Sequence, residues 1–70
     1  MVLIKFKDIE NNNKIVFGRL LPEDDPQFYR VETIPDKMIW NLSKSWYDVE
    51  ELTEEEIEEN KDEIYPEGTV

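Results

Sequence analysis

Carboxylates are the only abundant side chains in this sequence that can do chemistry. The 70 residues contain 18 aspartates and glutamates but no histidine and no cysteine. Disulfides and thiolate metal sites are therefore excluded, and so is the usual general base at neutral pH. The two serines, Ser43 and Ser45, have no histidine to activate them as nucleophiles. Hydrolysis of the catalytic-triad type is thus excluded.

Glycine loops and paired carboxylates give no better candidate for a reactive site. The two glycines, Gly18 and Gly68, are too far apart to form a phosphate-binding loop. The acidic run Glu23-Asp24-Asp25 lacks the alternation and the glycine of a calcium loop. A glycosidase needs a cleft that raises the pKa of one carboxyl group, and so short a chain has little room for one. We therefore expect no catalysis, no cofactor and no metal ion.

The acids are concentrated at one end of the chain. Residues 1–47 hold seven acids against seven bases and are neutral. Residues 48–70 hold eleven acids against the single base Lys61, so that 1 − 11 = −10 accounts for the whole net charge. Within 54–63 seven of ten residues are acidic. In a helix this is about one charge per 2 Å of axis, close to the roughly 1.7 Å per charge of duplex DNA.

The acidic segment also carries the signals of a helix. Thr53 is a cap, Glu56 three residues later completes a capping box, and Leu52 with Ile57 forms a hydrophobic staple. These signals predict a helix from about 54 to 64 within a helical unit 53–65, and the following Tyr-Pro-Glu-Gly sequence ends it. Residues 66–70 are expected to be a loose tail. The apolar stripe that would dock this helix is Leu52, Ile57, Ile64 and Tyr65.

The neutral residues before this segment have the patterns of short strands. Alternating apolar and polar residues predict strands at 2–7, 14–21 and 28–34. Three successive asparagines predict a hairpin turn between the first two strands, and Gly18 marks a bulge or a close crossing. Proline and acidic residues predict a loop at 22–26 and a turn at 35–37.

Residues 38–49 are compatible with two structures. Met38, Leu42 and Trp46 have helical spacing, yet Met38, Trp40 and Leu42 also alternate as in a strand. We favour a second hairpin, with a strand over 38–42, a polar turn at 43–45 and a strand over 46–49. The predicted fold class is mainly β or α+β. It comprises one domain, 1–70, in which an antiparallel sheet or barrel of four or five strands (1–52) precedes one acidic helix.

In the order of its elements, the chain resembles a small Src-homology-3-like barrel with a C-terminal helix. The resemblance covers residues 2–52, where short strands lead to a closing strand that passes through Val49-Glu50-Glu51-Leu52-Thr53 into the capped helix. In size, asparagine and glutamate content and lack of cysteine, the chain is also similar to small accessory proteins of phages and prophages. The resemblance implies a fold and transfers no functional residues.

Binding to another macromolecule is the function that these features favour. The acidic helix is either a solvated face that keeps a small protein in solution, or a surface that copies nucleic-acid charge and blocks a basic nucleic-acid-binding protein. Phe6, Phe17 and one of Phe28 or Tyr29 can fill a small core, so the remaining aromatic residues are candidate interface anchors. The candidate partner-binding residues are Glu51, Glu54, Glu55, Glu58, Glu59, Asp62, Trp40, Trp46 and Tyr47.

Other partners follow from the same composition. The surplus aromatic residues could also form the apolar seam of a homodimer, so the alternative function is a self-associating accessory subunit with a merely solvated helix. Direct binding to nucleic acid is not expected at a net charge of −10. The stretch Met1–Lys7 has too few apolar residues for a signal peptide or a membrane span. We therefore expect a cytoplasmic location and no membrane partner.

Overall fold

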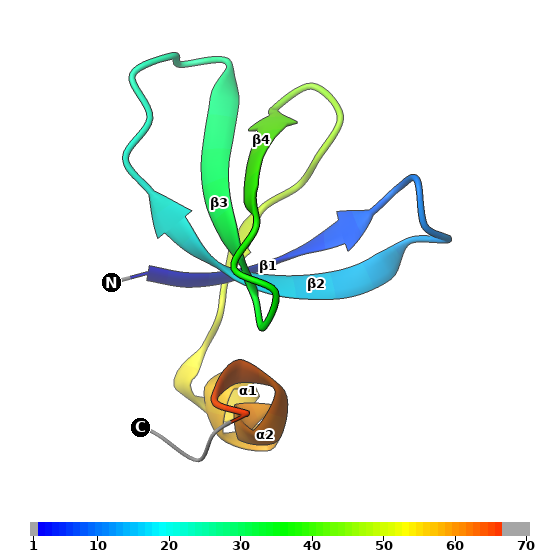
Figure 1. The fold of residues 1–70 in the computed structure, drawn as a ribbon, viewed down its shortest axis with the longest axis vertical. Coiled ribbons are helices and arrows are strands. Elements are labelled where there is room, and N and C mark those ends of the chain that lie inside the picture. Colours follow the sequence, from blue (N-terminus) through cyan, green and yellow to red (C-terminus); the bar gives the residue numbers. More distant parts are fainter. Residues whose placement is uncertain (1, 67–70) are drawn as a thin grey trace.

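In the part of the chain that the structure describes, five antiparallel strands form one sheet, and two short helices follow it (Figure 1). This is a computed structural model, which describes residues 2–66. The strand order in the sheet is β4-β3-β2-β1-β5. The elements are β1 (Val2–Asp8), β2 (Lys14–Leu21), β3 (Phe28–Ile34), β4 (Ile39–Ser43), β5 (Glu50–Glu51), α1 (Glu54–Glu59) and α2 (Lys61–Ile64). The predicted fold class, mainly β or α+β with a C-terminal helical segment, is confirmed.

The β1–β2 hairpin follows directly from the local sequence. Its ladder runs from Val2 opposite Leu20 to Asp8 opposite Lys14. In the turn, Asn12 and Asn13 have φ angles of 56° and 58°. Asparagine tolerates this left-handed conformation better than most residues, and two such residues in a row match the twist of a hairpin. The predicted asparagine turn is therefore confirmed.

Side chains on one face of the sheet form the main core. Ile4 and Phe6 of β1, Val31 of β3 and Leu42 of β4 are buried there. Around them pack Val16, Leu20, Tyr29, Trp40, Tyr47 and Val49. Successive residues of a strand face opposite sides, so the alternation in the sequence selected this face. The strand prediction for 38–42 is confirmed, since β4 occupies Ile39–Ser43.

Gly18 allows β3 to pass close to β2. A Cβ atom placed on Gly18 would lie 2.5 Å from Cγ1 of Val31 and 2.9 Å from the carbonyl oxygen of Glu32. Both distances are shorter than a carbon atom tolerates, so a side chain at this position needs a shift of β3. The close crossing that the sequence predicts at Gly18 is confirmed.

The helical segment covers part of the opposite face. Phe17 of β2, Leu52 and Ile64 are buried together there, with Ile57 and Tyr65 beside them. Leu3 and Ile34 of the sheet complete this second cluster. The apolar stripe predicted along the helix is therefore its docking face. Figure 1 shows α1 and α2 stacked below the strands, on one side of the sheet.

The helix begins as predicted but does not run unbroken to residue 64. The capping box is present: the N–H of Glu56 donates to Oγ1 of Thr53 at 3.2 Å, and the N–H of Thr53 donates to the Glu56 carboxylate at 3.2 Å. Asn60 interrupts the helix, with φ −116° and ψ 19°. The side-chain amide of Asn60 donates to the carbonyl of Glu56 at 2.8 Å. The backbone N–H of Asn60 donates to the same carbonyl at 3.0 Å. Asparagine competes in this way with regular helix, so two short helices replace the predicted one.

The predicted strand over 46–49 is wrong. The N–H groups of Trp46 and Tyr47 both donate to the carbonyl of Ser43 at 3.0 Å, so the polar turn continues through them. The last strand is Glu50–Glu51 only, and it pairs with β1 rather than with β4. Within residues 2–66 no ladder joins β4 to β5, so the resemblance to a Src-homology-3-like barrel stays a prediction. Of the predicted tail 66–70, residues 67–70 lie outside the described part.

Candidate functional site

Most acids of the helical segment are exposed because its apolar stripe, and not its carboxylates, packs on the sheet. Leu52 is 6% exposed and Ile64 is 3% exposed, both against Phe17. The carboxylates between and beside them are left at the surface. The exposed acids of β5, α1 and α2 are Glu50, Glu51, Glu54, Glu55, Glu58, Glu59, Asp62 and Glu63. All six acids predicted as partner-binding residues are therefore accessible.

Glu56 differs from the other helical acids because it pairs with the sheet. Its carboxylate accepts a hydrogen bond from Nζ of Lys5 in β1. Nζ of Lys5 also lies 3.7 Å from the carboxylate of Glu50 in β5. The pKa of Glu56 is lowered, mainly by the hydrogen bond from Lys5 and to a lesser extent by the hydrogen bond from the backbone of Thr53. The hydrogen bond between Lys5 and Glu56 also raises the pKa of Lys5. This cluster ties α1 to β1, so Glu56 has a structural role.

The remaining helical acids have little internal compensation. Lys61 lies 3.2 Å from Glu58, one turn away. Glu55 and Glu59 are four residues apart and both exposed. Like charges at this spacing repel by a few tenths of a kcal/mol per pair. A cationic surface placed against this face would therefore relieve repulsion as well as form new ion pairs.

The three predicted aromatic anchors have different environments. The ring of Trp40 packs on Phe6 at a centroid distance of 5.6 Å, and the ring of Tyr47 meets Phe6 edge-on at 5.9 Å. Burial, and then the charges of Glu10 and Asp8, raises the pKa of Tyr47. Trp46 is 72% exposed. Trp46 is thus the predicted anchor that lies open at the surface, whereas Trp40 and Tyr47 contribute mainly to packing.

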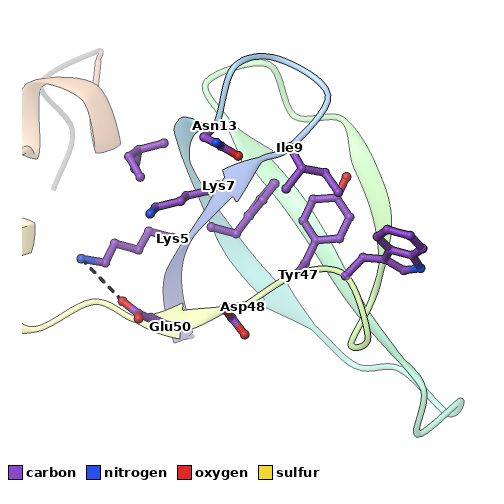
Figure 2. A pocket seen from close by; sticks show the side chains of 10 residues that line it. Lys5, Lys7, Ile9, Asn13, Tyr47, Asp48 and Glu50 are labelled. Carbon is purple, nitrogen blue, oxygen red and sulfur yellow. Dashed lines mark ion pairs between the residues drawn. The ribbon is translucent and has the colours of Figure 1, made fainter.

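An open pocket lies beside Trp46, between the turn after β4 and the outer edge of β1 (Figure 2). Its volume is about 390 Å³. In Figure 2, Ile9 and Tyr47 lie at one end of this pocket, and Lys5 pairs with Glu50 toward the other. The full lining is Lys5, Phe6, Lys7, Ile9, Asn13, Ile15, Trp46, Tyr47, Asp48 and Glu50. We call this the Trp46 pocket.

A second, larger depression lies between the end of α2 and the β2–β3 part of the sheet. Its volume is about 610 Å³, and Trp40 and Asp62 both line it. Asp8, Asp36 and Glu63 also contribute carboxylates, against the single base Lys14. We call this the Trp40 cleft. In this cleft a predicted aromatic residue, Trp40, and a predicted helical acid, Asp62, come together.

The predicted site residues are thus distributed over more than one surface. Trp46 and Tyr47 line the Trp46 pocket, which contains no residue of α1 or α2 among those described. Glu63, Ile9 and Ile15 belong to these surfaces but were not predicted. Glu63 continues the acidic run and could have been included on that ground. Ile9 lies in the turn after β1 and Ile15 lies in β2, and only the tertiary structure shows that they are 43% and 45% exposed.

These surfaces bring charged and apolar side chains together. No group of three or more acids within residues 2–66 is arranged to hold a metal ion. Neither helix in that part of the chain has the length and apolar character needed to cross a bilayer. The chain matches no protein-family model, no curated protein and no solved structure.

Proposed function

We propose that this chain is a small protein-binding module whose acidic helical segment contacts a basic surface of another protein. The observation that carries this proposal is the division of the segment into two faces. Its apolar residues are buried against Phe17, and Glu56 is held by Lys5, while the other acids are exposed. A surface that uses its apolar residues for docking and presents mainly carboxylates outward, with Lys61 the one exposed base among its described residues, is suited to a cationic partner.

In the sharpest form of the proposal, the partner is a nucleic-acid-binding protein and the chain occupies its basic groove. The line of charge along 54–63 has a density near that of duplex DNA before internal pairs are subtracted. Pairing of Glu56 and Glu58 with lysines lowers the effective density of this line. The role as an inhibitor from a phage or other mobile element rests on the resemblance in size and composition.

The experiment is a binding assay that separates helical charge from total charge. The chain is immobilised, proteins from a bacterial lysate are captured, and a captured basic protein is then purified and titrated. The test variant is Glu55→Gln, Glu59→Gln and Asp62→Asn. Its matched control, Glu10→Gln, Glu23→Gln and Asp24→Asn, removes as many exposed charges from the scaffold.

We expect the helical variant to bind at least tenfold more weakly, about 1.4 kcal/mol, and the control variant to bind nearly as the parent does. Binding should also weaken as salt rises, and duplex DNA should compete for the same partner. Equal affinity of the helical variant and the parent would refute the proposal. A shift of labelled duplex DNA by the chain itself would contradict its role as a protein binder.

A second candidate function, self-association as an accessory subunit, is favoured by the large apolar side chains at the surface. Those that are exposed are Val2, Ile9, Ile15, Phe28, Met38, Ile39 and Trp46. Apolar contact is insensitive to salt or strengthened by it, unlike the acidic contact proposed above. Sedimentation at low and high salt therefore distinguishes the two: a dimer that persists at high salt supports self-association.

A further inference from the structure

The outer edge of β4 has unpaired backbone groups. β4 is the last strand on its side of the sheet and pairs only with β3 within residues 2–66. On the β3 side, the N–H of Thr33 donates to the carbonyl of Met38 at 2.9 Å. Because backbone groups along a strand point alternately to the two sides, Ile39 and Asn41 turn their N–H and C=O groups outward. Such an edge is a template for another strand.

The available part of this edge is short and has sharp limits. At one end, the carbonyl of Ser43 already accepts two N–H groups of the following turn. At the other end, Lys37 has φ 58° and its N–H donates to the carbonyl of Thr33 at 2.9 Å. The residues whose outward N–H and C=O groups are both unbonded are Ile39 and Asn41, on either side of Trp40. A partner strand must fit this short segment.

We infer that the β4 edge pairs with the same edge of a second copy of the chain, antiparallel and with the two Trp40 residues opposite each other. In this register Ile39 of each copy lies opposite Asn41 of the other, and each such pair exchanges two hydrogen bonds. A slip of the register opposes Ile39 to Ser43 in one direction and Asn41 to Lys37 in the other, and the carbonyl of Ser43 and the N–H of Lys37 are already bonded. This inference rests on the second candidate function, self-association, and is independent of the acidic helix.

The side chains around this edge favour the same occupant. Met38 is 54% exposed and Ile39 is 52% exposed, and both would be covered by the second copy. Facing aromatic residues on neighbouring strands stabilise a sheet. The same register brings Lys44 toward the turn that carries Asp36 of the second copy. Residues 37–47 contain two lysines and no acid, so two chains of net charge −10 would meet through segments that are not negative.

Disulfide trapping tests both the pairing and its register, because the chain contains no cysteine. Two single variants, Ile39→Cys and Asn41→Cys, are mixed and oxidised, and the products are identified by mass. Directly opposed residues in a hydrogen-bonded antiparallel pair have Cα atoms about 5.5 Å apart, which a disulfide can span. Lys14→Cys, at an exposed position of β2, is the matched control for random collision.

The mixture should yield mainly the mixed disulfide, which joins position 39 of one copy to position 41 of the other. Its yield should be several-fold higher than that of either variant alone or of the Lys14→Cys control. Both sites are exposed, so the substitutions leave the fold intact. Equal yields from all combinations would overturn the inference, and dominant linkage of Asn41→Cys to itself would overturn the register.

A second measurement removes the hydrogen bond without cross-linking. Proline is tolerated on an edge strand where its nitrogen faces outward, so Asn41→Pro should keep the β3–β4 ladder and lose the outward N–H. By sedimentation, the parent and Asn41→Ala should dimerise, more tightly at high salt, and Asn41→Pro should dissociate at least tenfold more readily. A parent that stays monomeric at about 1 mM, a concentration that detects even a weak dimer, would overturn both this inference and the second candidate function. If Asn41→Pro left the dimer unaffected and Trp46→Ser abolished it, the second candidate function would stand, but the interface between β4 edges would be overturned.

Discussion

Replacing Gly18 by alanine should destabilise the fold, although the same exchange usually stabilises a strand. In an open strand, Gly→Ala gains roughly 0.5–1 kcal/mol because glycine loses more backbone freedom on folding. Here the new methyl group would lie 2.5 Å from Cγ1 of Val31 and 2.9 Å from the carbonyl oxygen of Glu32. Val31 is fully buried, so it cannot move aside into solvent.

The size of the effect follows from the cost of overpacking. Forcing an extra carbon into a packed core costs about 1–3 kcal/mol. A chain of this length has a free energy of unfolding of roughly 4–10 kcal/mol, at about 0.05–0.15 kcal/mol per residue. Gly18→Ala should therefore remove a substantial part of the stability. Arg30→Ala, an exposed change on β3, should alter it by less than about 0.5 kcal/mol.

A double-mutant cycle identifies the contact responsible. Val31→Ala alone should cost roughly 2 kcal/mol, from the lost apolar burial and the cavity. In the double variant the methyl group at position 18 occupies space that Cγ1 of Val31 has left. We expect the double variant to be at least about 1 kcal/mol more stable than the sum of the two single effects predicts.

Urea unfolding followed by tryptophan fluorescence and circular dichroism measures all four free energies. Trp40 packs on Phe6 in the same core and reports on its loss. Additive effects of Gly18→Ala and Val31→Ala would refute the reasoning, and so would a Gly18→Ala variant as stable as the parent. Either result would mean that β3 shifts away from β2 at little cost.

Three further predictions concern the helical segment and the surface. Thr53→Ala should lower the free energy of unfolding by about 1 kcal/mol, because Thr53 Oγ1 caps α1. Thr53→Ser keeps a capping hydroxyl and should therefore retain most of the parent's stability. Equal urea midpoints for the parent and Thr53→Ala would contradict this prediction. The ion pair between Glu56 and Lys5 should stabilise the fold fully above pH 4.5, and this stabilisation should disappear as the pH falls through the lowered pKa of Glu56. At alkaline pH the stabilisation should decrease above pH 10.5, as Lys5 loses its proton. Urea midpoints of the parent and Glu56→Gln should therefore converge at low pH, and a constant gap from pH 7 to pH 3 would refute the link. Trp46→Ala should change the free energy of unfolding by less than about 0.5 kcal/mol, because the Trp46 side chain is 72% exposed. Ile64→Ala should lower it by about 2–5 kcal/mol, because Ile64 is 3% exposed. If urea unfolding gave similar losses of free energy for the two variants, the surface position of Trp46 would be contradicted.

The parts of the fold that depend on neighbouring residues could be predicted from the sequence. Period-two alternation located β1, β2 and β3, and the asparagines set the hairpin turn through their tolerance of positive φ. Thr53, Glu56 and the staple residues defined the start of α1, since a capping box lies within four residues of chain. Local signals failed only where a side chain competed for the backbone, at Asn60, and where the turn after Ser43 continued.

The composition of the candidate surfaces could be predicted, but their grouping could not. The sequence by itself determined that the excess negative charge lies in the helical segment and that its apolar stripe must dock, because charge and period are properties of consecutive residues. Only the tertiary structure decided that Lys5, 51 positions away, holds Glu56. It also decided that Trp46 is exposed while Trp40 packs on Phe6, and that β5 joins β1 and leaves the edge of β4 open. These outcomes depend on which strands meet, and strand pairing is set by packing between residues far apart in the chain.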